Sequence, residues 1–150
     1  SFPTGTMRSP FELTEAFETN IGKLIWPVNS GFVSNKFGVH PHPAIKNVKI
    51  KNDGIDIQTT KGSKVYSVFS GKVSTVAFIP GMNNVIIINH GDYYSLYAKL
   101  KNLLVEKGDI IDKGQVIADI VTNLDGVSLL QFQIWKNNIK LNPEKWIIKK

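Results

Sequence analysis

Lys51-Asn-Asp-Gly-Ile-Asp-Ile57 is the stretch that decides the fold of this chain. Gly54 supplies a turn, and the alternation of isoleucine and aspartate after it predicts the start of a β-strand. The isoleucines face a core on this interpretation, so the Asp56 carboxylate points to the opposite face, where the side chain of Asn52 joins it. A carboxylate fixed on a strand and aimed into a groove is a natural metal ligand, but a single carboxylate does not hold zinc alone.

The composition fits one compact domain. The chain has 150 residues, of which 42% are apolar, and this is enough for a hydrophobic core. The formal charge of +6 favours acidic partners such as a cell-wall polymer, an acidic protein face or nucleic acid. Nucleic acid is the weakest of the three because the basic residues are scattered. The absence of cysteine excludes disulfides and thiolate metal sites.

The N-terminal part predicts one short helix. Ser9-Pro10-Phe11-Glu12 is typical of a capping box with proline at the first helical position. We expect a helix over Pro10–Ile21 that docks on the domain as part of a connector over residues 1–23. The domain itself is then expected over residues 24–150. No signal peptide and no apolar run of membrane-spanning length is present, so an exported protein would be a mature or trimmed form.

The remainder predicts an all-β fold. Leu24–Val28 is expected to be extended, Gly31–Gly38 to form a short element, and residues 40–48 a rigid loop. Candidate strands then follow, separated by glycines, at Gly54–Gln58, Lys64–Phe69, Lys72–Phe78, Asn84–Asn89, Tyr93–Leu100, Gln115–Val121 and Leu129–Trp135. Short strands with regular turn signals indicate a β-sandwich or barrel. Asn142 caps a closing helical turn.

Two of these strands carry polar and aromatic side chains on the face opposite the core. In the late strand, Leu130, Phe132 and Ile134 share one face, which leaves Leu129, Gln131 and Gln133 on the other. In the strand at residues 93–100, the even-numbered residues predict the core face. The odd-numbered residues, Tyr93, Ser95, Tyr97 and Lys99, are then expected on the outer face.

Taken together, these pieces resemble the lysostaphin-type (LytM-type) zinc endopeptidases that cut peptidoglycan cross-bridges. The resemblance runs from Trp26-Pro27 to Asn142-Pro143. Its landmarks, specific by their order and spacing, are Phe37-Gly38, Gly54–Ile57, Gly62 with Val65, Gly71–Val73, His90-Gly91, Tyr97-Ala98, Gly108-Asp109 and Gly114-Gln115. The resemblance implies an antiparallel β-sandwich of the barrel-sandwich hybrid type (a duplicated hybrid motif) with a short N-terminal helix.

The same resemblance implies that the zinc site is degenerate. The family pattern is His-x-x-x-Asp, His-x-His and a Tyr-Ala-His segment whose histidine assists the attacking water. This chain keeps Asp56 but has Asn52, Leu129, Gln131 and Lys99 where those histidines belong. Two amides and an alkyl group do not replace zinc ligands, and an ammonium is no base at neutral pH. We therefore expect an inactive peptidase with no metal and no cofactor.

Two other interpretations fit parts of the sequence. His40, His42 and His90 are the remaining histidines, and a metal site rebuilt from them would leave an unusual metallopeptidase. A lone histidine in a turn is more often structural. The paired glycine turns also occur in biotinyl and lipoyl carriers, but the lysine tip that carries their cofactor is missing here.

Loss of zinc residues on an intact scaffold resembles the EnvC-like murein hydrolase activators. That resemblance implies a protein partner, a cell-wall N-acetylmuramoyl-L-alanine amidase, bound in the degenerate groove during peptidoglycan remodelling and cell separation. It further implies a periplasmic or cell-envelope location, with any membrane division complex reached only through N-terminal regions outside this sequence. We expect the groove to be formed by Asn52, Asp56, Tyr97, Lys99, Leu129 and Gln131. The alternative is a peptidoglycan-binding module that uses the same groove.

Overall fold

The structure is a computed structural model, and it describes residues 8–150. It contains a nine-residue helix, α1 (Pro10–Glu18), a set of β-strands and a short 3₁₀ helix, η1 (Pro143–Lys145). The strands are β1 (Phe32–Asn35), β2 (Gly38–Pro41), β3 (Lys49–Asn52), β4 (Ile55–Thr59), β5 (Lys64–Tyr66), β6 (Gly71–Ile79), β7 (Asn83–His90), β8 (Tyr93–Lys101), β9 (Ile110–Ile111), β10 (Val116–Ile120), β11 (Ser128–Lys136) and β12 (Ile139–Leu141). The predicted all-β architecture with one short N-terminal helix is confirmed.

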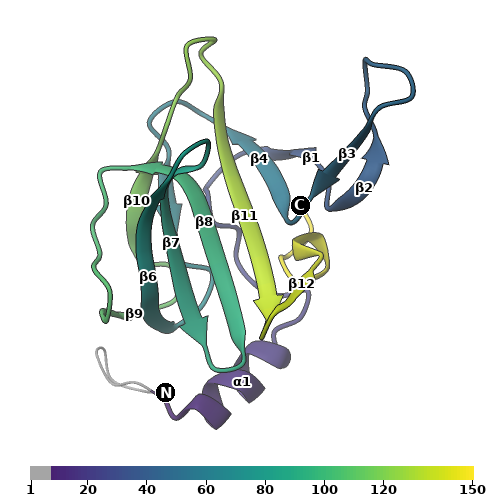
Figure 1. Cartoon of the computed structure of the whole chain (residues 1–150). Coiled ribbons are helices and arrows are strands. Elements are labelled where there is room, and N and C mark those ends of the chain that lie inside the picture. Colours follow the sequence, from purple (N-terminus) through teal and green to yellow (C-terminus); the bar gives the residue numbers. More distant parts are fainter. Residues whose placement is uncertain (1–7) are drawn as a thin grey trace.

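The strands form one large antiparallel sheet and a separate hairpin. The main order is β1-β4-β11-β8-β7-β6-β9, with β10 pairing with β5 and β8, and β12 pairing with β11. The hairpin β2–β3 projects from the sheet (Figure 1). Long-range pairing sets the position of Asp56, because Gln131 of β11 lies directly opposite it on β4. The stretch that begins at Lys51 therefore lies against the late strand.

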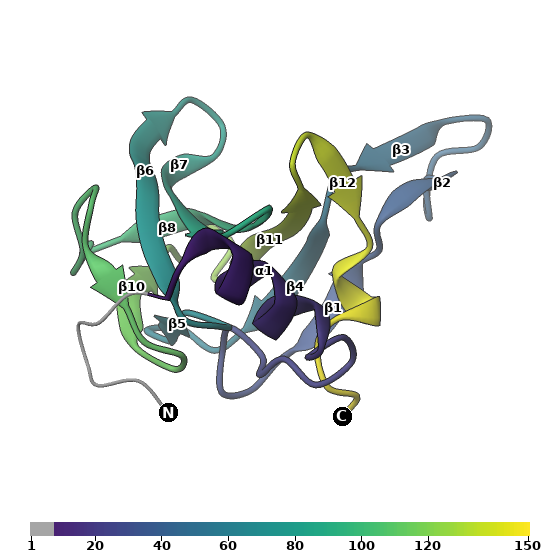
Figure 2. The same ribbon diagram turned by 90° about the horizontal axis from the view of Figure 1, so that it is seen from below.

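Helix α1 covers one end of the sheet, as Figure 2 shows from below. The predicted capping box is present, since the Ser9 side chain accepts from the Glu12 N–H and the Glu12 side chain accepts from the Ser9 N–H. The helix buries Leu13 and Phe17, and the Phe17 ring stacks on His90 and Tyr93 with centroids 4.9 and 4.8 Å apart. The helix packs against the core through these residues, and it ends at Glu18 rather than Ile21. The first seven residues of the expected connector lie outside the described residues.

The strand predictions differ from the structure mainly at the edges. Leu24–Val28 lies outside the named strands, and within it Leu24 makes one isolated parallel bridge with Ile147. The expected rigid loop over residues 40–48 is partly strand, since His40 and Pro41 end β2. The strands β3, β9 and β12 were not predicted. Asn142 does cap η1, with its side chain accepting from the Glu144 N–H at 3.1 Å.

The core lies between the sheet and the segments that fold over it. Ile55, Ile57, Leu130, Phe132 and Ile134 are each 0% exposed, as predicted for β4 and β11. In the part of the chain that the structure describes, every buried side-chain nitrogen or oxygen atom has a hydrogen-bond partner. Within residues 8–150, no helix combines the length and the apolar character that crossing a membrane requires.

Candidate functional site

Gly54 brings β4 close enough to β11 to form the site. A Cβ atom at this position would lie 2.1 Å from the carbonyl oxygen of Phe132, so only glycine permits this approach. The Gly54 N–H donates to the Asn52 side-chain oxygen at 3.1 Å, which closes the turn before β4. This turn places Asn52 and Asp56 on the same side of the sheet, beside Gln131.

A network of side-chain hydrogen bonds occupies the position where a zinc site is expected. The Gln131 side-chain nitrogen donates to the Asp56 carboxylate at 2.5 Å and to the Asn52 oxygen at 3.3 Å. Asn35 donates to the other carboxylate oxygen of Asp56 at 3.1 Å. Gln133 donates to the Gln131 oxygen at 3.0 Å, and the Trp135 indole donates to the Gln133 oxygen at 2.8 Å. We call these six residues the amide network.

The direction of every bond between Trp135 and Asp56 is fixed by the two ends. An indole N–H only donates and a carboxylate only accepts. The Gln133 oxygen must therefore face Trp135, and the Gln131 nitrogen must face Asp56. An amide NH₂ group directed at the carboxylate cannot ligate a cation. The residues of this site therefore do not fit zinc.

The positions of the side chains that could bind a metal agree with the conclusion that the site does not fit zinc. Within residues 8–150, no three side chains of His, Cys, Asp or Glu lie close enough together to hold a metal ion. His40 and His42 are engaged locally instead: the His40 Nε2 atom lies 3.1 Å from the Lys36 carbonyl oxygen, and the His42 Nδ1 atom accepts from the N–H groups of Ala44 and Ile45. His40 and His42 line one cavity with Asp56, but His90 is buried elsewhere in the core, so the three histidines do not form one site.

Leu129 borders a cavity beside Asp56. The cavity has a volume of about 620 Å³, and its other walls come from β1 and the β2–β3 hairpin. Its lining residues are Ser34, Asn35, Lys36, Phe37, His40, Pro41, His42, Pro43, Ile50, Asp56 and Leu129. We call this cavity and the adjacent amide network the groove. The cavity lining combines apolar side chains with amide, imidazole, lysine and carboxylate groups.

The prediction that Tyr97 lies in the groove is wrong. Tyr97 is 0% exposed and faces the core, where its ring lies 5.4 Å from that of Phe132. Its hydroxyl accepts from the Val68 N–H at 3.0 Å and donates to the Ser95 hydroxyl at 2.9 Å. Because these bonds satisfy the polar groups, Tyr93, Ser95 and Tyr97 face inward and are buried, and Tyr94 and Leu96 face outward and are only partly buried. Ala98 and Leu100 are buried as well, each 0% exposed.

Lys99 lies where the strand alternation is broken. Its φ angle of 68° is left-handed, and the register between β7 and β8 shifts beside it. Its N–H donates to the Met82 carbonyl, and its own carbonyl accepts from Val121. The structure joins Asn52, Asp56 and Gln131 by hydrogen bonds and places Leu129 beside them. Among the described residues, no hydrogen bond or ion pair joins Lys99 to that group.

His90 is a structural residue of the core. It is 0% exposed, and burial lowers its pKa to about 4. The Ser70 carbonyl can only accept, so the Nδ1–H group donates to it at 2.7 Å. Nε2 then accepts from the Ser95 hydroxyl at 2.7 Å. This arrangement holds a neutral imidazole and leaves it unavailable to a metal.

Three members of the amide network were missed as site residues: Asn35, Gln133 and Trp135. The alternation of β11 contains the signal for two of them, since Gln133 and Trp135 follow Gln131 at i+2 and i+4 on one face. Asn35 comes from the distant strand β1, and a register shift in the β1–β4 pairing brings it opposite Asp56. No local pattern in the sequence reports that shift.

Comparison with known proteins places this geometry in a family. Residues 50–143 match Peptidase family M23. The peptidoglycan DD-endopeptidase ShyB of Vibrio cholerae is 34% identical over 97 residues, which cover 62% of this chain and 22% of ShyB. The murein hydrolase activator NlpD of Salmonella typhimurium is 27% identical over 147 residues, or 97% of this chain and 37% of NlpD. The chain thus spans well under half the length of these relatives.

A solved structure extends the similarity to the whole domain. A chain of the SpoIIQ–SpoIIIAH pore forming complex matches with a TM-score of 0.71 and 26% identity, over 86% of this chain and 93% of that chain. The resemblance to the LytM-type peptidases is confirmed, and relatives named as activators fit the degenerate subgroup. By its match over residues 50–143, the chain belongs to Peptidase family M23.

Proposed function

We propose that this chain is an inactive member of its family that binds and activates an N-acetylmuramoyl-L-alanine amidase in the cell envelope. The observation that carries the proposal is the Gln131 amide, which donates to Asp56 and Asn52 in place of a metal. A site that presents donors to its only carboxylate has no means to polarise a peptide carbonyl through zinc. The scaffold nevertheless keeps an open groove beside that carboxylate.

Two relatives and one solved structure support the proposal of an inactive family member that binds and activates another protein. NlpD is named a murein hydrolase activator, and ShyB is named a peptidoglycan endopeptidase, so the domain occurs in both roles in proteins of the cell wall. The SpoIIQ–SpoIIIAH structure is a complex of two proteins, so a chain with this fold assembles with a protein partner. These properties belong to those proteins, and their transfer to this chain is part of the proposal.

The groove has the chemistry of a protein-binding surface. Leu129 supplies an apolar anchor at its edge, and the amides of the network supply fixed donors and acceptors. The chain carries a formal charge of +6, which favours an acidic partner surface. Lys36 lies in the cavity lining, and we expect its ammonium to meet a carboxylate of the bound partner.

A mixing assay tests the function. Dye release from labelled peptidoglycan is measured with the purified protein, with a cell-wall amidase of the same organism, and with both. We expect no release by the protein alone and a higher rate for the mixture than for the amidase alone. Tight binding to peptidoglycan sacs with an unchanged amidase rate would favour the wall-binding alternative. Release by the protein alone would overturn the assignment as an inactive peptidase.

Substitutions in the groove should reduce partner affinity without unfolding the protein. Leu129→Glu replaces an apolar anchor by a carboxylate, and Lys36→Glu reverses the charge of the cavity lysine that we expect to meet an acidic surface. Loss of a central anchor typically costs about 2 kcal/mol or more of binding, roughly a thirtyfold change in Kd. Titration calorimetry against the amidase measures this change. Leu104→Glu, at an exposed leucine outside the groove lining, is the matched control. Groove variants that melt and bind like the parent would contradict the assignment of the groove.

The purified protein should contain far less than one zinc ion per chain. The reason is the Gln131 NH₂ group that faces Asp56, because it offers the cation no lone pair. Elemental analysis after purification without chelators, followed by dialysis, checks the content. The triple variant Asn52→His/Leu129→His/Gln131→His places three imidazoles near Asp56 and serves as the positive control. Stoichiometric zinc in the unmodified protein would revive the interpretation as an unusual metallopeptidase.

A further inference from the structure

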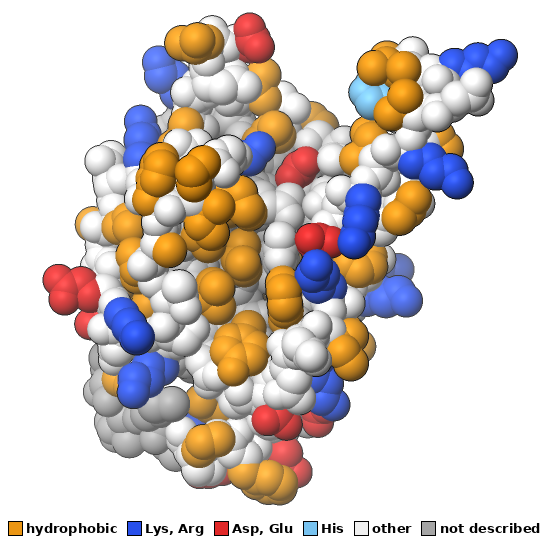
Figure 3. Space-filling model, viewed as in Figure 1, with side chains coloured by type: hydrophobic (Ala, Val, Ile, Leu, Met, Phe, Trp, Pro, Cys, Tyr) orange, Lys and Arg blue, Asp and Glu red, His pale blue; other side chains and the backbone are white. Residues whose placement is uncertain are grey.

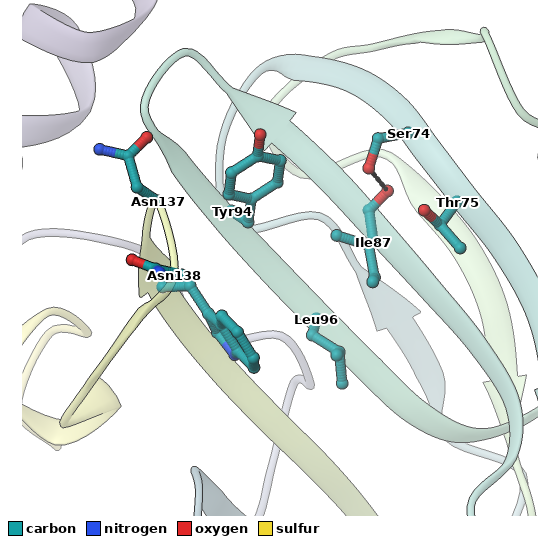
Figure 4. A pocket seen from close by; sticks show the side chains of 8 residues that line it. Ser74, Thr75, Ile87, Tyr94, Leu96, Asn137 and Asn138 are labelled. Atoms are coloured by element: carbon teal, nitrogen blue, oxygen red, sulfur yellow. Dashed lines mark hydrogen bonds between the residues drawn. The ribbon is translucent and has the colours of Figure 1, made fainter.

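A second cavity lies on the outer face of β6, β7, β8 and β11. It shares no lining residue with the cavity beside Asp56, although its Trp135 also belongs to the amide network. Its volume is about 670 Å³, in the range of small-molecule sites. It is lined by Ser74, Thr75, Ile87, Tyr94, Leu96, Trp135, Asn137 and Asn138. Figure 4 shows Tyr94, Ile87 and Leu96 projecting from neighbouring strands, with the two asparagines at one edge. We call it the aromatic pocket.

Strand register explains why these residues meet. Trp135 of β11 lies opposite Tyr94 of β8, and Leu96 of β8 lies opposite Ile87 of β7. Thr75 of β6 then lies opposite Ile87, so the pocket floor crosses four strands. Figure 3 shows hydrophobic side chains gathered over β6, β7 and β8 on one face of the molecule. The reversed alternation of β8 exposes Tyr94 and Leu96 to this floor while Tyr97 is buried.

The lining combines aromatic surface with neutral polar groups. None of the lining side chains carries a charge, although the chain as a whole has a formal charge of +6. The side chains of Thr75, Tyr94, Asn137 and Asn138 make no hydrogen bond among residues 8–150, so their donors and acceptors are open to a ligand. A neutral lining of this kind discriminates against ionic ligands, because a charged group placed there would lose hydration without gaining a counter-charge.

The rim of the pocket is held in place before any ligand binds. Asn137 occupies a left-handed conformation (φ 50°) in the turn between β11 and β12, and its N–H donates to the Asp92 carbonyl at 2.7 Å. The Asp92 N–H in turn donates to the Thr14 hydroxyl of α1 at 2.9 Å. The Trp135 ring is fixed by its bond to Gln133 and by the Lys140 ammonium, 5.2 Å from the ring centroid. Lys140 itself is paired with Asp53 at 3.0 Å.

We propose that the aromatic pocket binds an N-acetylated hexosamine of a glycan strand. The C–H face of a sugar ring packs on an aromatic ring such as Trp135 or Tyr94. The acetyl methyl group fits the aliphatic floor at Ile87 and Leu96. Hydroxyl and acetamido groups both donate and accept, as do the amides of Asn137 and Asn138. The ligand is uncharged, in keeping with the lining.

This inference goes beyond the proposed function and does not depend on it. The amidase proposal concerns the groove around Asp56, whereas the aromatic pocket shares none of its lining residues with the cavity there. The two surfaces lie on one side of the sheet, because Gln133 separates Gln131 from Trp135 along the same face of β11. A protein partner and a glycan strand can therefore contact the domain from the same direction.

Titration with chitotetraose, a linear oligomer of N-acetylglucosamine, tests the proposal. ¹H–¹⁵N NMR spectra of the protein should show saturable shifts confined to the pocket, including the Trp135 indole and the side-chain amides of Asn137 and Asn138. Trp135→Leu keeps an apolar side chain but removes the aromatic face, and should weaken binding about tenfold or more. Trp135→Phe should recover part of that loss. Asn138→Ala, on an exposed turn that does not support the core, should weaken binding several-fold.

Three controls make the result decisive. Phe78→Ala removes an exposed aromatic side chain outside the pocket and should leave binding unchanged. Leu129→Glu should also leave sugar binding unchanged, which separates this proposal from the amidase proposal. The proposal is overturned if chitotetraose causes no saturable shifts. Shifts that persist in Trp135→Leu, or binding of a glycan-free stem peptide in the pocket instead of the oligosaccharide, would overturn it as well.

Discussion

Phe132→Ala should lower the free energy of unfolding by about 3–5 kcal/mol, because it opens a cavity in a core that cannot close around it. Phe132 is 0% exposed and packs against the Tyr97 ring. In a protein of this size, such a loss lowers Tm by on the order of 10 °C. Thermal melting followed by circular dichroism, together with urea unfolding, measures the change.

Leu129→Ala is the matched control on the same strand. Leu129 lies on the groove face and is only partly buried, so its truncation should cost about 1 kcal/mol or less. The pair tests the alternation of β11 directly, since the two positions are three residues apart and face opposite sides of the sheet. Equal losses for the two variants, or a larger loss for Leu129→Ala, would contradict the placement of the core face.

Lowering the pH from 7 to 4 should cost about 3 kcal/mol of stability through His90 alone. Burial lowers the pKa of His90 to about 4, while an unfolded histidine titrates near 6.5. Over this pH range the imidazole of His90 therefore binds a proton in the unfolded state but not in the folded state. Stability from this source is complete above pH 6.5, falls as the pH approaches 4, and falls no further below it. Urea unfolding at half-unit pH steps measures the slope.

One variant separates His90 from the other titrating groups. His90→Gln should be less stable at pH 7 and should lack the slope between pH 6.5 and 4. Hydrogen bonds from Tyr93 and Lys136 lower the pKa of Glu18, and bonds from Asn102 and Lys64 lower that of Asp119. A slope that survives in His90→Gln would mean that another group carries it.

The orientation of β11 was predicted correctly and that of β8 was not, and the difference has a physical reason. In β11 the three central residues of one face, Leu130, Phe132 and Ile134, are all apolar, so the orientation of the strand follows from hydrophobicity alone. In β8 both faces carry apolar residues, and the choice depends on whether Tyr93, Ser95 and Tyr97 find partners inside. They do, through Val68, His90 and Glu18, all from other segments. Single-strand periodicity contains no information about those partners, which is why Tyr97 was placed on the wrong face.

Only part of the site was predicted, because here too some of the contacts come from other segments of the chain. Asp56, Asn52 and Gln131 followed from the family spacing, and the structure joins them by hydrogen bonds. That the amides would bond to the carboxylate could not be read from spacing, because it depends on the bulged pairing of β1 with β4 that delivers Asn35. The left-handed backbone at Lys99 likewise ends the alternation on which its placement was argued.

The fixed direction of the amide network has a consequence for the thermodynamics of association. Because Trp135 can only donate and Asp56 can only accept, the amide groups of Gln131 and Gln133 have one orientation rather than several of similar energy. These buried side chains, which lie beneath the surface of the groove, have therefore already lost their rotational freedom during folding. A bound molecule then restricts mainly its own side chains, so the entropic cost of complex formation falls chiefly on that molecule.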